Sequence, residues 1–170
     1  MRVAQSPSLA TARRPKPAAW ARVITVALLV IAADWISKQA VEESIRPGEE
    51  RKLLPGIELV YTHNNGVAFG LFAGAQVYVT VALALVVLAV LLYFVRRSGR
   101  GIIWLPAGLL IGGACGNIID RLRYGSVTDF IKLPLGWPPF NIADAAITIA
   151  VVMLVFIVGR AVEEKPREGG

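Results

Sequence analysis

Three long stretches of the chain carry no charged side chain. They cover residues 64–95, 101–119 and 145–159. A helix crosses the hydrocarbon core of a bilayer, about 30 Å thick, with about 20 mostly apolar residues. Only 18% of the 170 residues are charged, whereas about 25% are charged in soluble globular proteins. The pattern predicts a polytopic membrane protein, and it excludes a nucleic-acid-binding domain, a secreted disulfide scaffold and an ordinary cytosolic enzyme.

The distribution of apolar residues predicts a mainly α fold with four transmembrane helices and a small extracytoplasmic β-element. The four helices are expected at residues 18–38, 76–95, 101–119 and 142–158. The basic leader also makes the first segment compatible with a signal peptide, but no small-x-small cleavage motif follows its apolar run. We therefore interpret it as a membrane-spanning helix.

Lysine and arginine are distributed unevenly among the predicted loops. Five precede the apolar core of the first span, three lie between the second and third spans, and three follow the fourth. Basic residues in short loops are enriched on the cytoplasmic side. By contrast, residues 34–58 hold six acidic against four basic residues, and the charges of residues 120–144 sum to zero. Both termini are therefore expected in the cytoplasm, with loops 39–75 and 120–141 on the outer side of the membrane.

One membrane domain accounts for most of the chain. We expect it over residues 18–160, because no linker or internal repeat interrupts that range. Residues 1–17, rich in Pro, Ala and Arg, read as a disordered basic cytoplasmic tail. Residues 161–170 read as a second cytoplasmic tail.

The outer loops contain the expected β-element. Apolar and polar residues alternate over 57–62 after a Pro-Gly turn, which predicts a short strand. The Asn-Asn-Gly cluster at 64–66 predicts a turn. Residues 127–131 are mostly apolar and β-branched or aromatic, so they also have strand propensity.

The chain has four aspartates, and the predicted topology places all of them at the outer membrane surface. Asp34 and Asp120 lie near the outer ends of the first and third spans. Asp144 lies at the outer start of the fourth span, and Asp129 lies in the loop before it. An ionisable group at this depth is unfavourable, so it indicates a function.

Three of these aspartates also have a structural interpretation. Asp34 and Lys38 are four residues apart on a helix, so they can form an ion pair. Asp120 can pair with its neighbour Arg121. Asp144 can simply cap its helix, because a carboxylate is stabilised at a helix N-terminus. The sequence alone leaves these alternatives open.

Asp129 is harder to explain structurally, because it lies within an apolar segment and would be partly desolvated. Paired with Asp144, it would form a site of two carboxylates. Two like charges a few ångströms apart share one proton near neutral pH. One carboxylate can then activate water while the other protonates a carbonyl or a leaving amine. This is aspartic peptidase chemistry, and it requires neither a metal nor a covalent nucleophile.

Other patterns point to structure rather than chemistry. Gly108, Gly112 and Gly116 are spaced by four, which favours close helix packing. His63 is the single histidine and Cys115 the single cysteine. A histidine-rich metal site, a cysteine zinc cluster and an internal disulfide are therefore excluded, and no cofactor is expected.

Five motifs occur in an order that resembles the bacterial lipoprotein signal peptidase family, also called signal peptidase II. They are DWISK at 34–38, NNGVAFG at 64–70, GGACGNIIDR at 112–121, VTDF at 127–130 and FNIAD at 140–144. Val67, within the second motif, departs from the alanine more usual in that family. This departure affects packing rather than catalysis.

The resemblance implies a membrane aspartic endopeptidase of the bacterial cell membrane. Such an enzyme removes signal peptides from prolipoproteins whose cysteine carries diacylglycerol, and it cuts just before that cysteine. The partners implied are these substrates and membrane lipids, with no nucleic acid and no metal. The catalytic aspartates would be Asp129 and Asp144. Residues that support the site or bind substrate would be Asp34, Lys38, Asn64, Asn117, Asp120, Arg121 and Asn141.

A small proton-coupled transporter or channel is the alternative, since intramembrane acids also serve as proton relays. A relay would place acids near the membrane midplane, whereas all four aspartates are expected at one surface. Two other classes of intramembrane peptidase are disfavoured because the chain contains neither a Gly-x-Gly-Asp nor a Gly-x-Ser-Gly motif.

Overall fold

The computed structural model describes two continuous parts of the chain, residues 17–65 and 103–163, and some positions between them. Those positions are 78, 81–82, 85–87, 89–90 and 92, and all of them are helical. The predicted second span at 76–95 therefore lies largely outside the described residues. Most of both predicted tails lies outside them as well.

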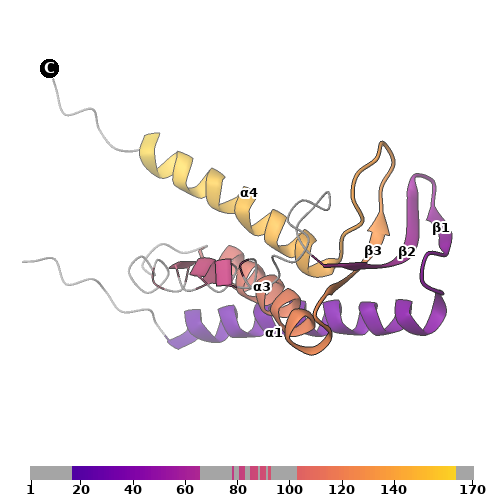
Figure 1. Cartoon of the computed structure of the whole chain (residues 1–170). Helices are drawn as coiled ribbons and strands as arrows, with labels where there is room; N and C mark the ends of the chain where they lie inside the picture. Colours follow the sequence, from indigo (N-terminus) through magenta and orange to yellow (C-terminus); the bar gives the residue numbers. More distant parts are fainter. Residues whose placement is uncertain are drawn as a thin grey trace, which may run out of the picture.

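The described residues form a mainly helical fold with one small sheet (Figure 1). In chain order the elements are α1 (Pro17–Ser44), β1 (Glu50–Leu54), β2 (Ile57–Asn64), α3 (Trp104–Tyr124), β3 (Val127–Lys132) and α4 (Ile142–Glu163). Three of the four predicted helices overlap α1, α3 and α4. The strands predicted at 57–62 and 127–131 are β2 and β3. These predictions are confirmed, whereas β1 was not predicted.

Within the described residues, α1 is the one helix whose length and hydropathy suffice to cross a bilayer. Ile142–Ile157 of α4 is a shorter apolar helical stretch. Four membrane-spanning helices therefore remain a prediction.

Glycines let α3 pack closely against both other helices. A Cβ on Gly112 would lie 2.8 Å from the carbonyl oxygen of Ala27 in α1. A Cβ on Gly113 would overlap the carbonyl oxygen of Ala143 in α4. The close packing predicted from the glycine spacing is confirmed. It brings the polar side chains near the C-terminal ends of α1 and α3 and at the start of α4 within reach of one another.

We expect Gly113→Ala to destabilise the protein, because neither the methyl group nor the α4 backbone has room to move. Overpacking of this kind lowers the free energy of unfolding by about 1–3 kcal/mol. The matched control is Gly159→Ala in α4, where no atom lies within 4 Å of the added Cβ. Alanine favours a helix over glycine by about 1 kcal/mol, so the control should be neutral or stabilising. Thermal unfolding in detergent distinguishes the two, and equal melting temperatures would contradict the packing argument.

The sheet is antiparallel with strand order β1-β2-β3. Gly125 ends α3 in a left-handed conformation with φ 72°, so the chain turns directly into β3. Phe130 of β3 packs against Val41 in the last turn of α1 and Ile45 just after it. Asn64 was predicted in a turn, but it is the last residue of β2, where it pairs with Val127. This pairing places its side chain beside the start of β3.

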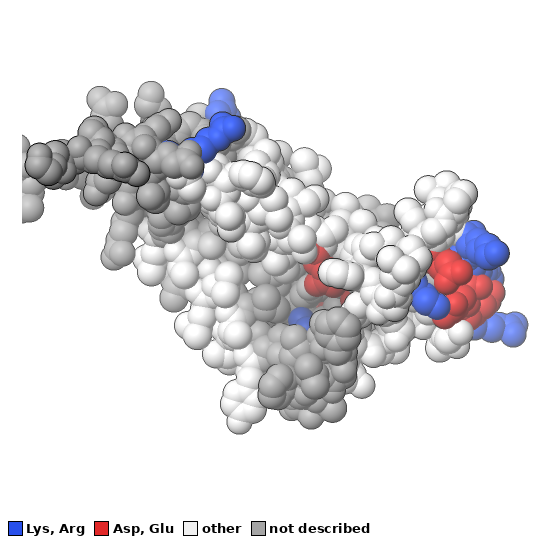
Figure 2. Space-filling model, turned by 90° about the horizontal axis from the view of Figure 1, so that it is seen from above, with Lys and Arg blue, Asp and Glu red and all other residues white. Residues whose placement is uncertain are grey.

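Charged side chains gather at the sheet end of the molecule (Figure 2). Lys132 forms ion pairs with Glu50 and Glu58, and Arg51 pairs with Glu49. In the same view the surface beside the sheet end is largely uncharged, and acidic atoms are visible in a recess within it. An uncharged surface next to a charged end is the pattern of a membrane protein.

Candidate active site

Asp129 lies in the middle of β3, and its side chain is buried, with 2% of the residue exposed. Both carboxylate oxygens accept hydrogen bonds from asparagine amides. Asn141 donates to Oδ1 at 2.7 Å, and Asn64 donates to Oδ2 at 3.0 Å. Because these two asparagines come from different parts of the chain, the carboxylate is held from both sides.

Asp144 is the third residue of α4 and is half-buried. Its Oδ1 accepts a hydrogen bond from the amide of Asn117 in α3 at 2.7 Å. Its Oδ2 accepts the backbone N–H of Asn141 at 3.4 Å, while Asn141 Oδ1 accepts the backbone N–H of Asp144 at 2.9 Å. This reciprocal pair is a capping box. Asp144 therefore caps its helix and also directs one oxygen toward α3.

Asn141 connects the two carboxylates. It is fully buried, and its amide nitrogen also contacts the oxygen of Asn117 at 3.2 Å. The pKa of Asp129 is raised from 3.8 to about 7, mainly by burial and in addition by the nearby charge of Asp144. Hydrogen bonds from Asn64 and Asn141 oppose this rise. At neutral pH Asp129 is thus poised between its protonated and ionised forms, as general acid–base catalysis requires.

Lys38 joins two buried carboxylates on different helices. Its Nζ lies 2.6 Å from Asp34 Oδ2 and 2.7 Å from Asp120 Oδ2. All three residues are buried. The predicted pair of Asp34 and Lys38 is confirmed. The cation that pairs with Asp120 is Lys38 on α1, where we had predicted its neighbour Arg121, because the close contact of α1 and α3 brings Lys38 across.

This Lys38 cluster, formed by Lys38, Asp34 and Asp120, also holds the backbone beside each site aspartate. Asp34 Oδ1 accepts the N–H of Ala143 at 2.9 Å, one residue before Asp144. Asp120 Oδ2 accepts the N–H of Thr128 at 3.4 Å, one residue before Asp129. The cluster therefore fixes α4 and β3 relative to α1. It can set the spacing of the two site carboxylates without contacting either of them through a side chain.

The structure brings the predicted site residues into one region. Arg121 is half-buried, and its Nη1 donates to the carbonyl oxygen of Asn117 at 3.2 Å. The sequence analysis missed Glu42 and Thr128, whose side chains are joined at 3.1 Å between α1 and β3. Glu42 follows Lys38 by four residues, so the spacing already placed it on the same face of the helix.

His63 and Cys115 lie outside this hydrogen-bonded region. His63 is exposed on β2, where Nδ1 lies 3.4 Å from Ser126 Oγ and the ring contacts Tyr61 edge-on. Cys115 is half-buried in α3. In the part of the chain that the structure describes, no three His, Cys, Asp or Glu side chains are grouped so that they could hold a metal ion.

Comparison with known proteins identifies the family of the chain. Residues 26–159 match the family model described as signal peptidase (SPase) II. A lipoprotein signal peptidase from Moorella thermoacetica is 40% identical over 149 residues, covering 85% of this chain and 97% of that protein. One from Syntrophomonas wolfei is 42% identical over 132 residues, covering 77% and 88%.

Two solved structures, both described as bacterial membrane enzymes, share the fold. One has a TM-score of 0.80 at 24% identity and covers 94% of this chain and 99% of its own. The other has a TM-score of 0.73 at 25% identity, with coverages of 87% and 97%. Together with the family match and the curated relatives, these likenesses favour a peptidase over a transporter or channel. The chain belongs to the signal peptidase II family.

Proposed function

We propose that this chain is an aspartic endopeptidase that removes signal peptides from diacylglyceryl-modified prolipoproteins, cutting before the lipidated cysteine. Its family makes it a peptidase of a bacterial membrane. The observation that carries the aspartic mechanism is the pair Asp129 and Asp144, whose carboxylates are linked through Asn141. Buried carboxylates that influence each other's charge are what an aspartic dyad needs.

In the proposed reaction the pair holds one proton. The ionised carboxylate takes a proton from a water molecule, and the water oxygen attacks the scissile carbonyl carbon. The protonated carboxyl group gives its proton to the carbonyl oxygen. The tetrahedral intermediate then collapses: one of its hydroxyl groups returns a proton to the pair as the C=O bond re-forms, the C–N bond breaks, and the leaving amine receives a proton from the pair, which again holds one proton. Water is consumed and no other reagent is needed.

The surrounding residues act as positioning residues in this proposal. Asn64, Asn117 and Asn141 orient the carboxylates through the hydrogen bonds given above. The Lys38 cluster holds the adjacent backbone. Arg121 lies one residue beyond Asp120 in the last turns of α3, so it adds a positive charge near the pair.

We further propose four transmembrane helices, both termini in the cytoplasm, and the site on the outer side of the membrane. Basic residues are in excess in the N-terminal tail, between the second and third predicted spans and after the fourth, and this distribution supports the orientation. The site residues lie where α1 and α3 approach their C-terminal ends and where α4 begins. Acyl chains on a substrate cysteine remain in the outer leaflet, so they would present the scissile bond at that depth.

Cleavage should therefore require prior lipidation of the substrate. The purified protein in bilayer nanodiscs is given the same prolipoprotein with and without diacylglycerol on its cysteine. Anchoring by the acyl chains raises the local concentration of the bond at the site, so we expect a preference of about 10²-fold or more. Release of signal peptide, followed by mass spectrometry, measures both rates. Equal cutting of the two precursors would instead identify a general signal peptidase.

A further inference from the structure

A groove of about 640 Å³ lies at the far end of the sheet, away from the aspartate pair. It is bounded by residues 52–56 of the β1–β2 hairpin and by residues 132–136 at the end of β3 and in the loop after it. On β3, Lys132 is three residues beyond Asp129. Because a strand rises about 3.3 Å per residue, the groove begins about 10 Å from the site along the sheet.

The groove exposes large apolar side chains that no described residue covers. Leu53 is 55% exposed, Leu54 is 59% exposed and Leu135 is completely exposed. Leu135 also has a φ of 67°, a left-handed conformation that is unfavourable for residues other than glycine, asparagine and aspartate. A leucine with a strained backbone and a fully exposed side chain is unfavourable in a loop that faces water. The sequence thus retains apolar side chains where a soluble loop would have polar ones.

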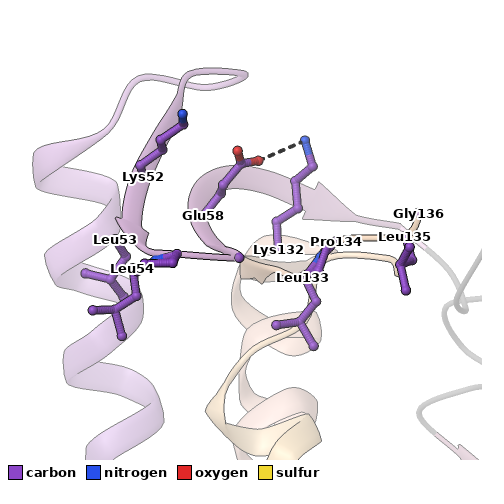
Figure 3. Close-up of a pocket in the computed structure, with 11 residues that line it drawn as sticks. Lys52, Leu53, Leu54, Glu58, Lys132, Leu133, Pro134, Leu135 and Gly136 are labelled. Carbon is purple, nitrogen blue, oxygen red and sulfur yellow. Dashed lines mark ion pairs between the residues drawn. The ribbon is translucent and has the colours of Figure 1, made fainter.

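The leucines and the charges point in opposite directions. In Figure 3 the side chains of Leu54, Leu133 and Leu135 point along the direction in which the helices run away from the sheet. Lys52 and Lys132 point the other way. Figure 1 shows the hairpin and the loop after β3 projecting to the same side of the helical body. The sheet therefore overhangs the helices with an apolar underside and a charged upper side.

We propose that this leucine tip, formed by Leu53, Leu54, Leu133 and Leu135, docks on the phospholipid surface beside the helices and inserts its leucines among the acyl chains. The underside faces in the direction in which α1 runs away from the sheet, and α1 exposes apolar side chains such as Leu28, Leu29 and Ile36. A bilayer surface is the partner that fits. The bilayer would surround the helices and so lie opposite the apolar underside, whether or not a substrate is present.

The attraction is apolar rather than electrostatic. The charges at this end of the sheet balance, since Glu49, Glu50 and Glu58 are matched by Arg51, Lys52 and Lys132. Lys132 forms ion pairs with Glu50 and Glu58, and Arg51 pairs with Glu49. Binding to a lipid surface depends on buried apolar area and on attraction to anionic lipids. With the charges balanced, only the first contribution remains. Docking should therefore be insensitive to salt and to the fraction of anionic lipid.

Site-directed spin labelling in nanodiscs tests the proposal, with one protein molecule per disc and no substrate. Cys115→Ala provides a background without reactive cysteine, and labels are placed through Leu54→Cys or Leu135→Cys. The matched control is Lys52→Cys. Its side chain points away from that of Leu54, because the strand is irregular between the two residues. Labels at 54 and 135 should collide several-fold more with oxygen than with an aqueous nickel chelate, and the label at 52 should show the reverse. Neither result should change in 1 M NaCl or in purely zwitterionic lipid.

The proposal is overturned if labels at 54 and 135 are as accessible to the nickel chelate as the label at 52. It is also overturned if they become shielded only when substrate is added, because the groove would then be a substrate site. A phospholipid with a photoreactive acyl chain, used on the unsubstituted protein, gives an independent result if a cysteine variant fails to fold. Adducts are expected on residues 53–54 and 133–135, and their absence would contradict docking. Neither readout depends on peptidase activity.

Discussion

Asp129→Asn and Asp144→Asn should each reduce turnover of a lipidated precursor to near background. Asparagine preserves the shape of the side chain but cannot accept and return a proton. General acid–base assistance contributes about 10²–10⁴-fold in rate. In the proposed mechanism the two carboxylates act as one unit, so the double variant should be little slower than either single variant. Single-turnover cleavage of a lipidated precursor measures all three.

The control for this result is Asp120→Asn, which also neutralises a buried aspartate. Asp120 contacts Lys38 and the backbone of Thr128, so its loss should lower the melting temperature as well as the rate. Near-normal turnover of Asp129→Asn, with a stable but inactive Asp120→Asn, would show that the pair is wrongly assigned. Asp120 would then be the partner of Asp144.

The pH dependence of stability provides a second check on Asp129. Burial holds its pKa at about 7 in the folded protein, compared with 3.8 in the absence of the fold. Between these values the folded chain retains a proton that the unfolded chain has lost. The free energy of unfolding should therefore fall as pH rises from about 4 through 7. Asp129→Asn should remove that part of the slope, which unfolding in denaturant at several pH values would reveal.

Lys38→Met should cause the largest loss of stability among single substitutions in the site. It leaves Asp34 and Asp120 buried without the cation that lies 2.6 Å and 2.7 Å from them. Removing one partner of a buried ion pair reduces the free energy of unfolding by about 3–5 kcal/mol. Equilibrium unfolding in mixed micelles measures the change.

Lys132→Met is the matched control, because Lys132 also lies between two carboxylates, Glu50 and Glu58. Its ion pairs are exposed to solvent, where such pairs contribute little. Adding Asp34→Asn and Asp120→Asn to Lys38→Met should restore part of the lost stability, since no unpaired charge then remains buried. Similar effects of Lys38→Met and Lys132→Met would show that burial does not control this cluster.

Local patterns predicted the parts of the fold that depend on local physics. Apolar runs located α1, α3 and α4, and alternation located β2. The spacing of Asp34 and Lys38 predicted their ion pair because both lie on one helix. β1 was not predicted because its sequence, Glu50–Leu54, has three charged residues and no alternation of apolar and polar residues. Its pairing with β2 comes from the turn between them rather than from its own propensity.

The contacts that shape the site could not be predicted in the same way, because they join distant parts of the chain. Asp120 pairs with Lys38 only because α3 lies against α1. Asn141 contacts Asp129, Asn117 and its own helix at once, and no sequence spacing encodes such a set. The family resemblance pointed to these residues, but their roles came from the geometry.

The capping box of Asp144 has a consequence for resistance to inhibitors. A bacterium escapes a drug by replacing a residue that the drug contacts while keeping the target protein functional. The carboxylate of Asp144 accepts the backbone N–H at the start of α4 with one oxygen and the amide of Asn117 with the other. An escape substitution there would weaken the start of the helix and remove the proposed proton carrier together. Compounds anchored on this carboxylate should therefore select resistance elsewhere in the chain, or not at all.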